Sequence, residues 1–214
     1  MKKDRPHHLL FNKISSVYGL FFESQRKSFK AAIDNARSEL DITAFKSVLD
    51  IGSGTGALCS VLSQMGLETS GIEPAEKMRQ VALKKTSGLS ITFKNENILE
   101  RLTFDDQSFD LVMASYVAHG LSPENRERMY LEMYRVARDY VILHDFNQSR
   151  SQLVTLVEWM EGSDYLRFIK NAEMELRDLQ INGKRYFDDV TVVKVSKHAS
   201  WYICKVSPNQ TQSE

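Results

Sequence analysis

The chain has 214 residues, and its 28 lysines and arginines balance 28 aspartates and glutamates, so the formal net charge is zero. This balance argues against a strongly basic nucleic-acid-binding protein. Hydrophobic residues make up 42% and charged residues 26%, which is typical of a folded domain and excludes a disordered chain. The two cysteines, Cys59 and Cys204, are too few for a disulfide framework or a zinc site and suit a reducing cytosol.

The sequence gives no sign of a membrane or secretory protein. No apolar run approaches the roughly 20 residues of a membrane-spanning helix. No apolar stretch of the signal-peptide kind follows the basic N-terminus. We therefore expect a cytoplasmic protein without a membrane span. The length suits one domain over residues 1–206, followed by a flexible polar tail at 207–214.

Apolar periodicity predicts helices and strands that alternate along the first two thirds of the chain. Helices are expected at 12–40 (with a break at Gly19), 57–65, 75–85 and 122–137. Strands are expected at 47–51, 68–72, 91–93, 109–114 and 140–144. Gly66 suits the end of the second helix, and Ser122 followed by Pro123 suits the start of the fourth. Such alternation is the signature of a parallel α/β sheet.

The last third has a different pattern. A long helical region is expected at 151–179, with a break at Gly162, and two β-rich runs follow at 190–195 and 200–206. The link between these runs is too short for a parallel crossover, so they must form an antiparallel hairpin. The predicted fold is α/β and Rossmann-like, with helices on both faces of a seven-stranded sheet. Five of its strands are parallel, and the C-terminal hairpin supplies the other two.

The segment most informative about function is a strand that carries Asp50 into the turn Gly52-Ser53-Gly54-Thr55-Gly56 and then a helix. Glycines are needed where a ligand approaches the backbone or where φ is positive. The start of the helix adds unpaired N–H groups and a partial positive charge. Gly52, Gly54 and Ala57 also fit the dinucleotide fingerprint, so a nicotinamide-dependent oxidoreductase is an alternative. Glu73 fits ribose recognition in either case.

Three motifs in this order, VLDIGSGTG, GIEP and FDDQSFDLVMA, resemble those of class I S-adenosylmethionine-dependent methyltransferases. The resemblance covers about residues 11–147 and is closest to small bacterial enzymes of the ubiquinone and menaquinone methyltransferase kind. That family's fold also ends in an antiparallel strand pair. The resemblance implies an N-terminal helical cap at 1–45, a cofactor-binding core at 46–146, and a helical region with the terminal hairpin at 147–206. The expected product is S-adenosylhomocysteine.

The resemblance also assigns cofactor-binding residues. Asp50 and the turn would lie at the methionine moiety, Glu73 would bind the ribose, and Ser115 would lie near the sulfonium. Asn97 falls where the family contacts the adenine amino group, although Glu96 is an alternative for that role. In this family the N-terminal helix closes over the cofactor, so the resemblance makes Tyr18 and Phe11 candidates for cofactor contact. The full predicted set is Tyr18, Asp50, Gly52, Ser53, Gly54, Gly56, Glu73, Pro74, Met78, Asn97, Ile98 and Ser115.

Methyl transfer from a sulfonium needs positioning and desolvation of the two partners, and a base where the acceptor must lose a proton. His119 follows the fourth expected strand and His144 ends the fifth, at the sheet edge where ligands bind in this architecture. Both are therefore candidate catalytic bases, with hydrogen-bonded structural histidines as the alternative. A metal triad of His119, His144 and Asp145 is a weaker possibility, and no metal is expected.

These patterns favour a methyltransferase that acts on a small molecule. Methylation of RNA or protein is the second reading, which the zero net charge and the absence of an added binding domain oppose. A cofactor-binding protein without transferase activity is the third. The sequence names no acceptor, and either a monomer or a homodimer is compatible with it.

Overall fold

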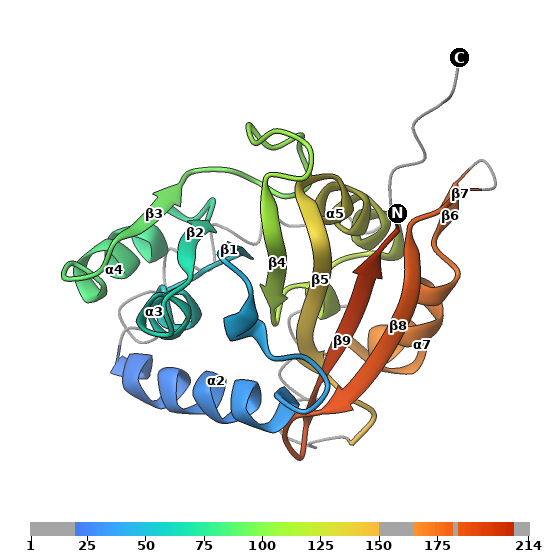
Figure 1. The fold of residues 1–214 in the computed structure, drawn as a ribbon, viewed down its shortest axis with the longest axis horizontal. Helices are drawn as coiled ribbons and strands as arrows, with labels where there is room; N and C mark the ends of the chain where they lie inside the picture. The colour runs from blue at the N-terminus through green and yellow to red at the C-terminus, as the bar shows by residue number, and fades with distance from the viewer. Residues whose placement is uncertain (1–19, 150–164, 182–183, 208–214) are drawn as a thin grey trace.

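The structure is a computed structural model that describes residues 20–149, 165–181 and 184–207 (Figure 1). A seven-stranded sheet forms its centre. In chain order its strands are β1 (Ser47–Ile51), β2 (Glu68–Ile72), β3 (Ile91–Lys94), β4 (Phe109–Ser115), β5 (Ala137–Phe146), β8 (Phe187–Lys194) and β9 (Ala199–Val206). The sheet order is β3-β2-β1-β4-β5-β9-β8.

The pairing of the strands confirms the predicted fold class. Parallel pairing joins β3 to β2, β2 to β1, β1 to β4 and β4 to β5. Strand β9 is antiparallel both to β5 and to β8, as expected for a terminal hairpin. The carboxyl ends of the five parallel strands therefore meet at one edge of the sheet, where ligands bind in open α/β folds.

Helices cover both faces of this sheet. Their bounds are α2 (Phe22–Ala36), α3 (Ala57–Gln64), α4 (Glu76–Lys85), α5 (Pro123–Val136) and α7 (Tyr165–Arg177), with short 3₁₀ turns η1 (Ile42–Ala44) and η2 (Ala118–Gly120). In Figure 1, α2 and α3 lie in front of the sheet, and α5 lies behind it. Among the described residues, no helix is both long and apolar enough to cross a bilayer.

Successive residues of a strand point to opposite faces, and this alternation builds two cores. Val48 and Leu111 pack in one apolar cluster with residues of α2 and α3. Leu49 and Val112, their neighbours in sequence, pack in a second cluster with residues of α5 and α7. Because both faces are buried, the parallel strands read as continuous apolar runs in the sequence.

Most predicted element bounds agree with the structure to within three residues. Ser122 accepts a hydrogen bond from the Asn125 N–H at 3.4 Å and so caps α5 as expected. Gly66 follows the C-cap of α3 with φ +96°, which confirms its role. The helix expected at 151–179 is described only from Tyr165, where α7 begins, and the Gly162 break lies outside the described residues. The helix expected at 12–40 is likewise described only from residue 20, so its Gly19 break lies outside them too.

The structure also contains features that the sequence did not indicate. A small two-stranded ribbon, β6 (Gln180–Ile181) with β7 (Lys184–Arg185), follows α7. Strand β5 begins directly at Ala137, where α5 ends, because Ala137 pairs with Phe109 of β4. Side-chain periodicity does not show where such pairing begins, since it reports burial and not ladder hydrogen bonds.

A bidentate ion pair fixes α7 against α5. The Arg126 guanidinium is fully buried and donates from Nε and Nη2 to the Glu175 carboxylate at 2.8 and 2.7 Å. Its Nη1 donates to the Leu121 carbonyl at 2.7 Å, and its Cζ lies 5.7 Å from the centroid of the Phe168 ring. This one side chain therefore joins α5, α7 and the loop that carries η2.

We predict that Glu175→Ala lowers the free energy of unfolding by about 3 kcal/mol, because it leaves a buried guanidinium without its carboxylate. Urea unfolding would measure this loss. The matched control is Glu173→Ala on the same helix, whose exposed ion pair with Arg177 should contribute less than about 0.5 kcal/mol. Equal losses in the two variants would contradict the role assigned to the buried pair.

Candidate active site

The glycine turn between β1 and α3 adopts a conformation that other residues rarely reach. Gly52 and Gly56 have φ values of +66° and +77°, in the left-handed region. A Cβ on Gly52 would lie 2.8 Å from the Val117 side chain, and one on Gly56 would lie 3.0 Å from the Ala82 Cβ. Gly56 is also the N-cap of α3, so the turn presents its backbone at the start of a buried helix.

The Glu73 carboxylate joins the turn after β1 to the turn after β2. Its Oε2 accepts a hydrogen bond from the Gly54 N–H at 3.0 Å, and its Oε1 accepts one from the Ala75 N–H at 2.8 Å. The residue is buried at the carboxyl end of β2. The carboxylate therefore lies beside the glycine turn, at the position where the resemblance places the ribose.

Asp50 is buried beneath the same turn. Its Oδ2 accepts a hydrogen bond from the Cys59 thiol at 3.2 Å, whereas its Oδ1 has no partner among the described residues. Burial, with a further contribution from the charge of Glu73, raises the pKa of Asp50 to about 7. A carboxyl group with an unpaired buried oxygen is poised to accept a cationic donor, which would favour its ionised form.

Two serines near the turn also have buried hydroxyl oxygens without a partner in the described part of the chain. They are Ser53, within the turn, and Ser115, the last residue of β4. Buried polar atoms in folded proteins are nearly always hydrogen-bonded, so unpartnered ones indicate a ligand or water position. The Ser53 side chain fits at this position because residue 71 of β2 is a glycine: a Cβ on Gly71 would lie 2.9 Å from the Ser53 side chain.

The segment after β3 distinguishes the two adenine candidates. Glu96 accepts hydrogen bonds from the backbone N–H and the hydroxyl of Thr103, so its carboxylate holds the loop in place. Among the described residues, the Asn97 Oδ1 accepts one hydrogen bond, from the Leu99 N–H at 3.1 Å, and Ile98 beside it is buried. Asn97 therefore suits ligand contact better than Glu96 does. Met78, the other residue expected near the adenine, is buried on α4.

The two candidate bases have different environments. The ring Nδ1 of His119 lies 2.7 Å from the Asp145 Oδ1, and its backbone N–H donates to Oδ2 at 3.3 Å. The His144 ring packs edge-on against Phe29 and lies 5.0 Å from the ring of Tyr116. Burial lowers the pKa of His144 to about 4, although the charge of Asp145 partly opposes this shift. His144 is thus a weak proton acceptor at neutral pH.

Tyr116 links the bases to the glycine turn. It has a φ of +56°, a left-handed conformation that is rare for a bulky residue and is a sign of a functional site. Burial, followed by the charge of Asp145, raises the pKa of Tyr116 to about 12, so its phenol is neutral. The next residue, Val117, contacts Gly52, and η2 then carries His119.

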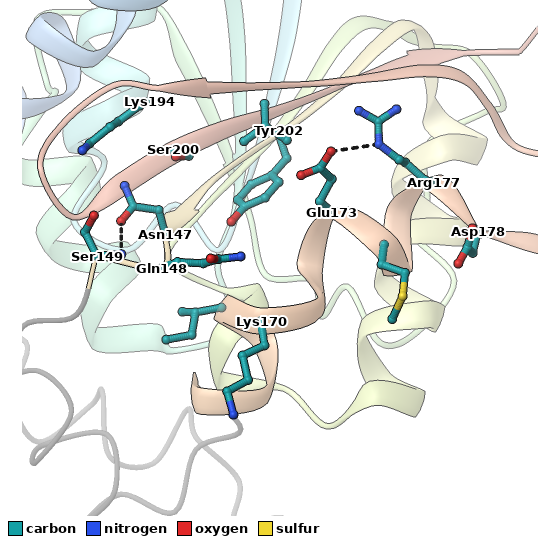
Figure 2. A pocket seen from close by; sticks show the side chains of 13 residues that line it. Asn147, Gln148, Ser149, Lys170, Glu173, Arg177, Asp178, Lys194, Ser200 and Tyr202 are labelled. Atoms are coloured by element: carbon teal, nitrogen blue, oxygen red, sulfur yellow. Dashed lines mark hydrogen bonds and ion pairs between the residues drawn. The ribbon is translucent and has the colours of Figure 1, made fainter.

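A groove of about 500 Å³ opens at the same edge of the sheet, between α7 and the terminal hairpin. Figure 2 shows the Tyr202 hydroxyl, the Gln148 amide and the Glu173 carboxylate within it. The Tyr202 hydroxyl donates to the Phe146 carbonyl at 3.1 Å, and the Phe146 ring lies 4.8 Å from that of His119. The groove is therefore connected, through Tyr202 and Phe146, to the group of rings around His119, which we call the His119 cluster.

Comparisons with known proteins agree with this geometry. Residues 48–139 match the methyltransferase domain family. An uncharacterized methyltransferase of Staphylococcus carnosus is 25% identical over 190 residues, which are 85% of this chain and 88% of that protein. Magnesium protoporphyrin IX methyltransferase of Synechocystis, solved with bound S-adenosylmethionine, superposes with TM-score 0.58 at 15% identity and covers 85% of this chain and 79% of that one.

Phosphoethanolamine N-methyltransferase 1 of Haemonchus contortus, in complex with phosphoethanolamine and S-adenosylhomocysteine, superposes with TM-score 0.72 at 19% identity. The match covers 97% of this chain and 51% of that one. The chain is a methyltransferase with the class I methyltransferase fold. Its cofactor is S-adenosylmethionine.

The residues at the glycine turn of this methyltransferase fit that cofactor. Asp50 Oδ1 and the hydroxyls of Ser53 and Ser115 offer three unpartnered buried polar atoms to a ligand that carries an ammonium group, a carboxylate and a ribose. Glu73 lies across the turn from them. Contacts link Gly54 to Glu73, and the charge of Glu73 acts on Asp50, so these predicted cofactor residues lie close together. Tyr18 and Phe11 lie outside the described residues.

Sequence reasoning missed several residues of this site in the methyltransferase. Val117 covers Gly52, Gly71 makes room for Ser53, and Gln25 of α2 accepts a hydrogen bond from the Thr55 hydroxyl at 3.0 Å. No local pattern marks these residues, because each acts through a contact between distant segments. The metal triad considered from sequence is not formed: no group of three ligating side chains is assembled in the part of the chain that the structure describes.

We predict that Glu73→Ala weakens S-adenosylhomocysteine binding by about 1–3 kcal/mol, because two charge-assisted hydrogen bonds to the ribose are lost. Isothermal titration calorimetry would measure the change. Glu68→Ala, at the exposed start of the same strand, is the matched control and should leave the affinity unchanged. If Glu73→Ala binds as tightly as the native protein while its fold is intact, the ribose assignment is wrong.

A second prediction concerns pH. The pKa of Asp50 rises from 3.8 to about 7 on folding. Between these two pH values, the Asp50 carboxyl group is therefore protonated in the folded state and ionised in the unfolded state. The contribution of Asp50 to stability therefore falls as pH rises from about 4 to 7. If the ligand's ammonium group binds Asp50, the ionised form is favoured and binding at pH 6.5 releases a proton.

Calorimetry of S-adenosylhomocysteine binding in two buffers of different ionisation enthalpy would count that proton. Asp50→Asn should abolish the release and flatten the pH dependence of unfolding. Proton release that persists unchanged in Asp50→Asn would assign it to another group.

Proposed function

We propose that this methyltransferase transfers the methyl group of S-adenosylmethionine to a small-molecule acceptor, with His119 as the base that takes the acceptor's proton. The observation that carries this proposal is the His119–Asp145 pair, which lies at the same edge of the sheet as the glycine turn. Val117 contacts that turn and His119 follows two residues later, so the base and the cofactor residues share one short loop.

The cofactor, when bound, supplies a methyl group that is already activated by the positive charge on sulfur. The protein's own residues then have three tasks. Glu73 and Asn97 hold the two ends of the nucleoside, and Asp50 with the glycine turn holds the methionine moiety. The aromatic side chains around His119 exclude water from the acceptor side, which strengthens the electrostatic interactions there.

A small acceptor is favoured over RNA or protein for two reasons. The chain has zero net charge, and a groove of about 500 Å³ adjoins the His119 cluster, a volume in the usual range of small-molecule sites. The resemblance to ubiquinone and menaquinone methyltransferases lies in the cofactor motifs. These motifs carry no acceptor specificity, so they do not select a quinone. Monomer and homodimer are both compatible with this proposal.

His119 is preferred to His144 as the base. The low pKa of His144 leaves it a poor proton acceptor, and its ring is held among Phe29 and Tyr116. His119 has an acidic partner at one ring nitrogen, which is the usual arrangement of a catalytic histidine. We therefore assign His144 a packing role beside the site.

The experiment combines binding with transfer. We expect micromolar binding of S-adenosylmethionine and S-adenosylhomocysteine in calorimetry, and no binding of NADH. Transfer of labelled methyl to phenols, amines and carboxylates would then be measured for the native protein, His119→Gln and His144→Gln. We predict that His119→Gln lowers kcat by about 10²–10⁴-fold with cofactor affinity unchanged, while His144→Gln has a much smaller effect.

Binding without transfer to any acceptor class would favour a cofactor-binding protein without activity. Binding of NADH alone would favour the oxidoreductase. Native turnover in His119→Gln would refute the base assignment and leave the cofactor assignment intact.

A further inference from the structure

The Asp145 carboxylate contacts His119 at two points. Oδ1 lies 2.7 Å from the ring Nδ1, and Oδ2 accepts the backbone N–H of the same residue at 3.3 Å. Oδ1 also accepts the Phe146 N–H at 2.8 Å, so the carboxylate is itself held in place. Asp145 is only 1% exposed and lies at the carboxyl end of β5. A rigid strand therefore fixes both the ring and the backbone of His119.

The contact at Nδ1 determines the tautomer of His119. A carboxylate only accepts hydrogen bonds, so Nδ1 must carry the proton and the basic lone pair lies on Nε2. The negative charge also favours the protonated ring after it has taken up a proton. Aromatic rings hold the plane of the imidazole: Phe146 is 4.8 Å away by centroid, and Tyr165 of α7 is 6.4 Å away.

Few other charges act on this pair in the described part of the chain. The titratable groups that face it from β4, β5, α5, α7 and β9 are Tyr116, His144, Tyr130, Tyr165 and Tyr202. Burial first, and then the charge of Asp145, raises the pKa of Tyr116 and of Tyr202, and burial raises that of Tyr130. These phenols stay neutral at working pH. Of the charged groups that act on these phenols, Arg126 and Glu175 form an ion pair, and Glu173 acts on Tyr202.

We propose that Asp145 is the positioning residue of the reaction, and that the acceptor is a protic nucleophile, a hydroxyl or a protonated amine, which His119 deprotonates. This inference rests on the proposed function. The acceptor's proton passes to Nε2, and its freed lone pair forms the new bond to the methyl carbon. The carbon–sulfur bond breaks and sulfur keeps the electron pair, so the imidazolium and a neutral thioether balance the charge.

The chemistry of the pair favours an acceptor that must lose a proton over a carboxylate. Carboxylates are already ionised at neutral pH and need no base, so an oriented histidine would add nothing to their methylation. The buried negative charge of Asp145 would also repel an anionic acceptor. Hydroxyl groups and ammonium groups must lose a proton before they can attack, and they bring no negative charge to the site.

The first test reads the tautomer directly in the native protein. Long-range ¹H–¹⁵N spectra of its five histidines, with the His119 signals assigned by His119→Gln, should show His119 protonated at Nδ1 when neutral. A ring protonated at Nε2 would overturn the proposal without any need for a folded Asp145 variant.

The second test compares Asp145→Asn with Asp139→Asn, a matched change at the other end of β5. We expect Asp145→Asn to mix the tautomers, to lower the pKa of His119 by at least about one unit, and to leave S-adenosylhomocysteine affinity within about twofold, whereas Asp139→Asn changes none of these. An unaltered His119 titration in Asp145→Asn would refute the positioning role, even if His119→Gln is inactive and the proposed function stands.

Transfer assays complete the test with three probes: catechol, 2-phenylethylamine and benzoate. We expect methyl transfer to catechol or to the amine. In Asp145→Asn, kcat should fall about 10²–10⁴-fold, and the acid limb of the pH–rate profile should move to lower pH. Faster transfer to benzoate than to either protic probe would refute the acceptor class. The same rates in Asp145→Asn and the native protein would refute the positioning role.

Discussion

The two hydrogen bonds that the Glu73 carboxylate accepts, from Gly54 and from Ala75, are the constraint on which the site depends. They tie the turn after β1 to the turn after β2, so the ends of two parallel strands form one unit. Left-handed glycines are needed for that turn, and Gly71 leaves room for Ser53 beside it. A change in either strand's register would break this link, because side chains would exchange faces.

Two different electrostatic environments lie side by side along this edge of the sheet. On the cofactor side, buried oxygens of Asp50, Ser53 and Ser115 lack partners in the described structure and are suited to a polar, cationic ligand. Around η2, where we propose that the acceptor binds, aromatic rings surround the His119–Asp145 pair. This division suits a reaction in which a charged donor is gripped firmly and the acceptor meets a base in a water-poor setting.

The helical layer supports the acceptor side from behind. Arg126 hydrogen-bonds Glu175 of α7 and the carbonyl of Leu121, so it links α5 and α7 to the end of the η2 turn that carries His119. Such a fully buried guanidinium is costly to desolvate and gains little net stability from its pair. Its value in this fold is geometric, since it fixes the loop that links Val117 over the glycine turn to His119 beside Asp145.

The sequence by itself determined the strand and helix order, the parallel sheet with its terminal hairpin, and the glycine turn with Asp50 and Glu73. These features are local: periodicity, capping residues and glycine spacing are written in consecutive residues. Only the tertiary structure decided that Thr103 occupies the Glu96 carboxylate, that His144 is buried, and that the Asp145 carboxylate meets the His119 ring. Those outcomes depend on burial and on contacts between segments far apart in the chain, and such contacts set pKa values and tautomers without any pattern in the sequence.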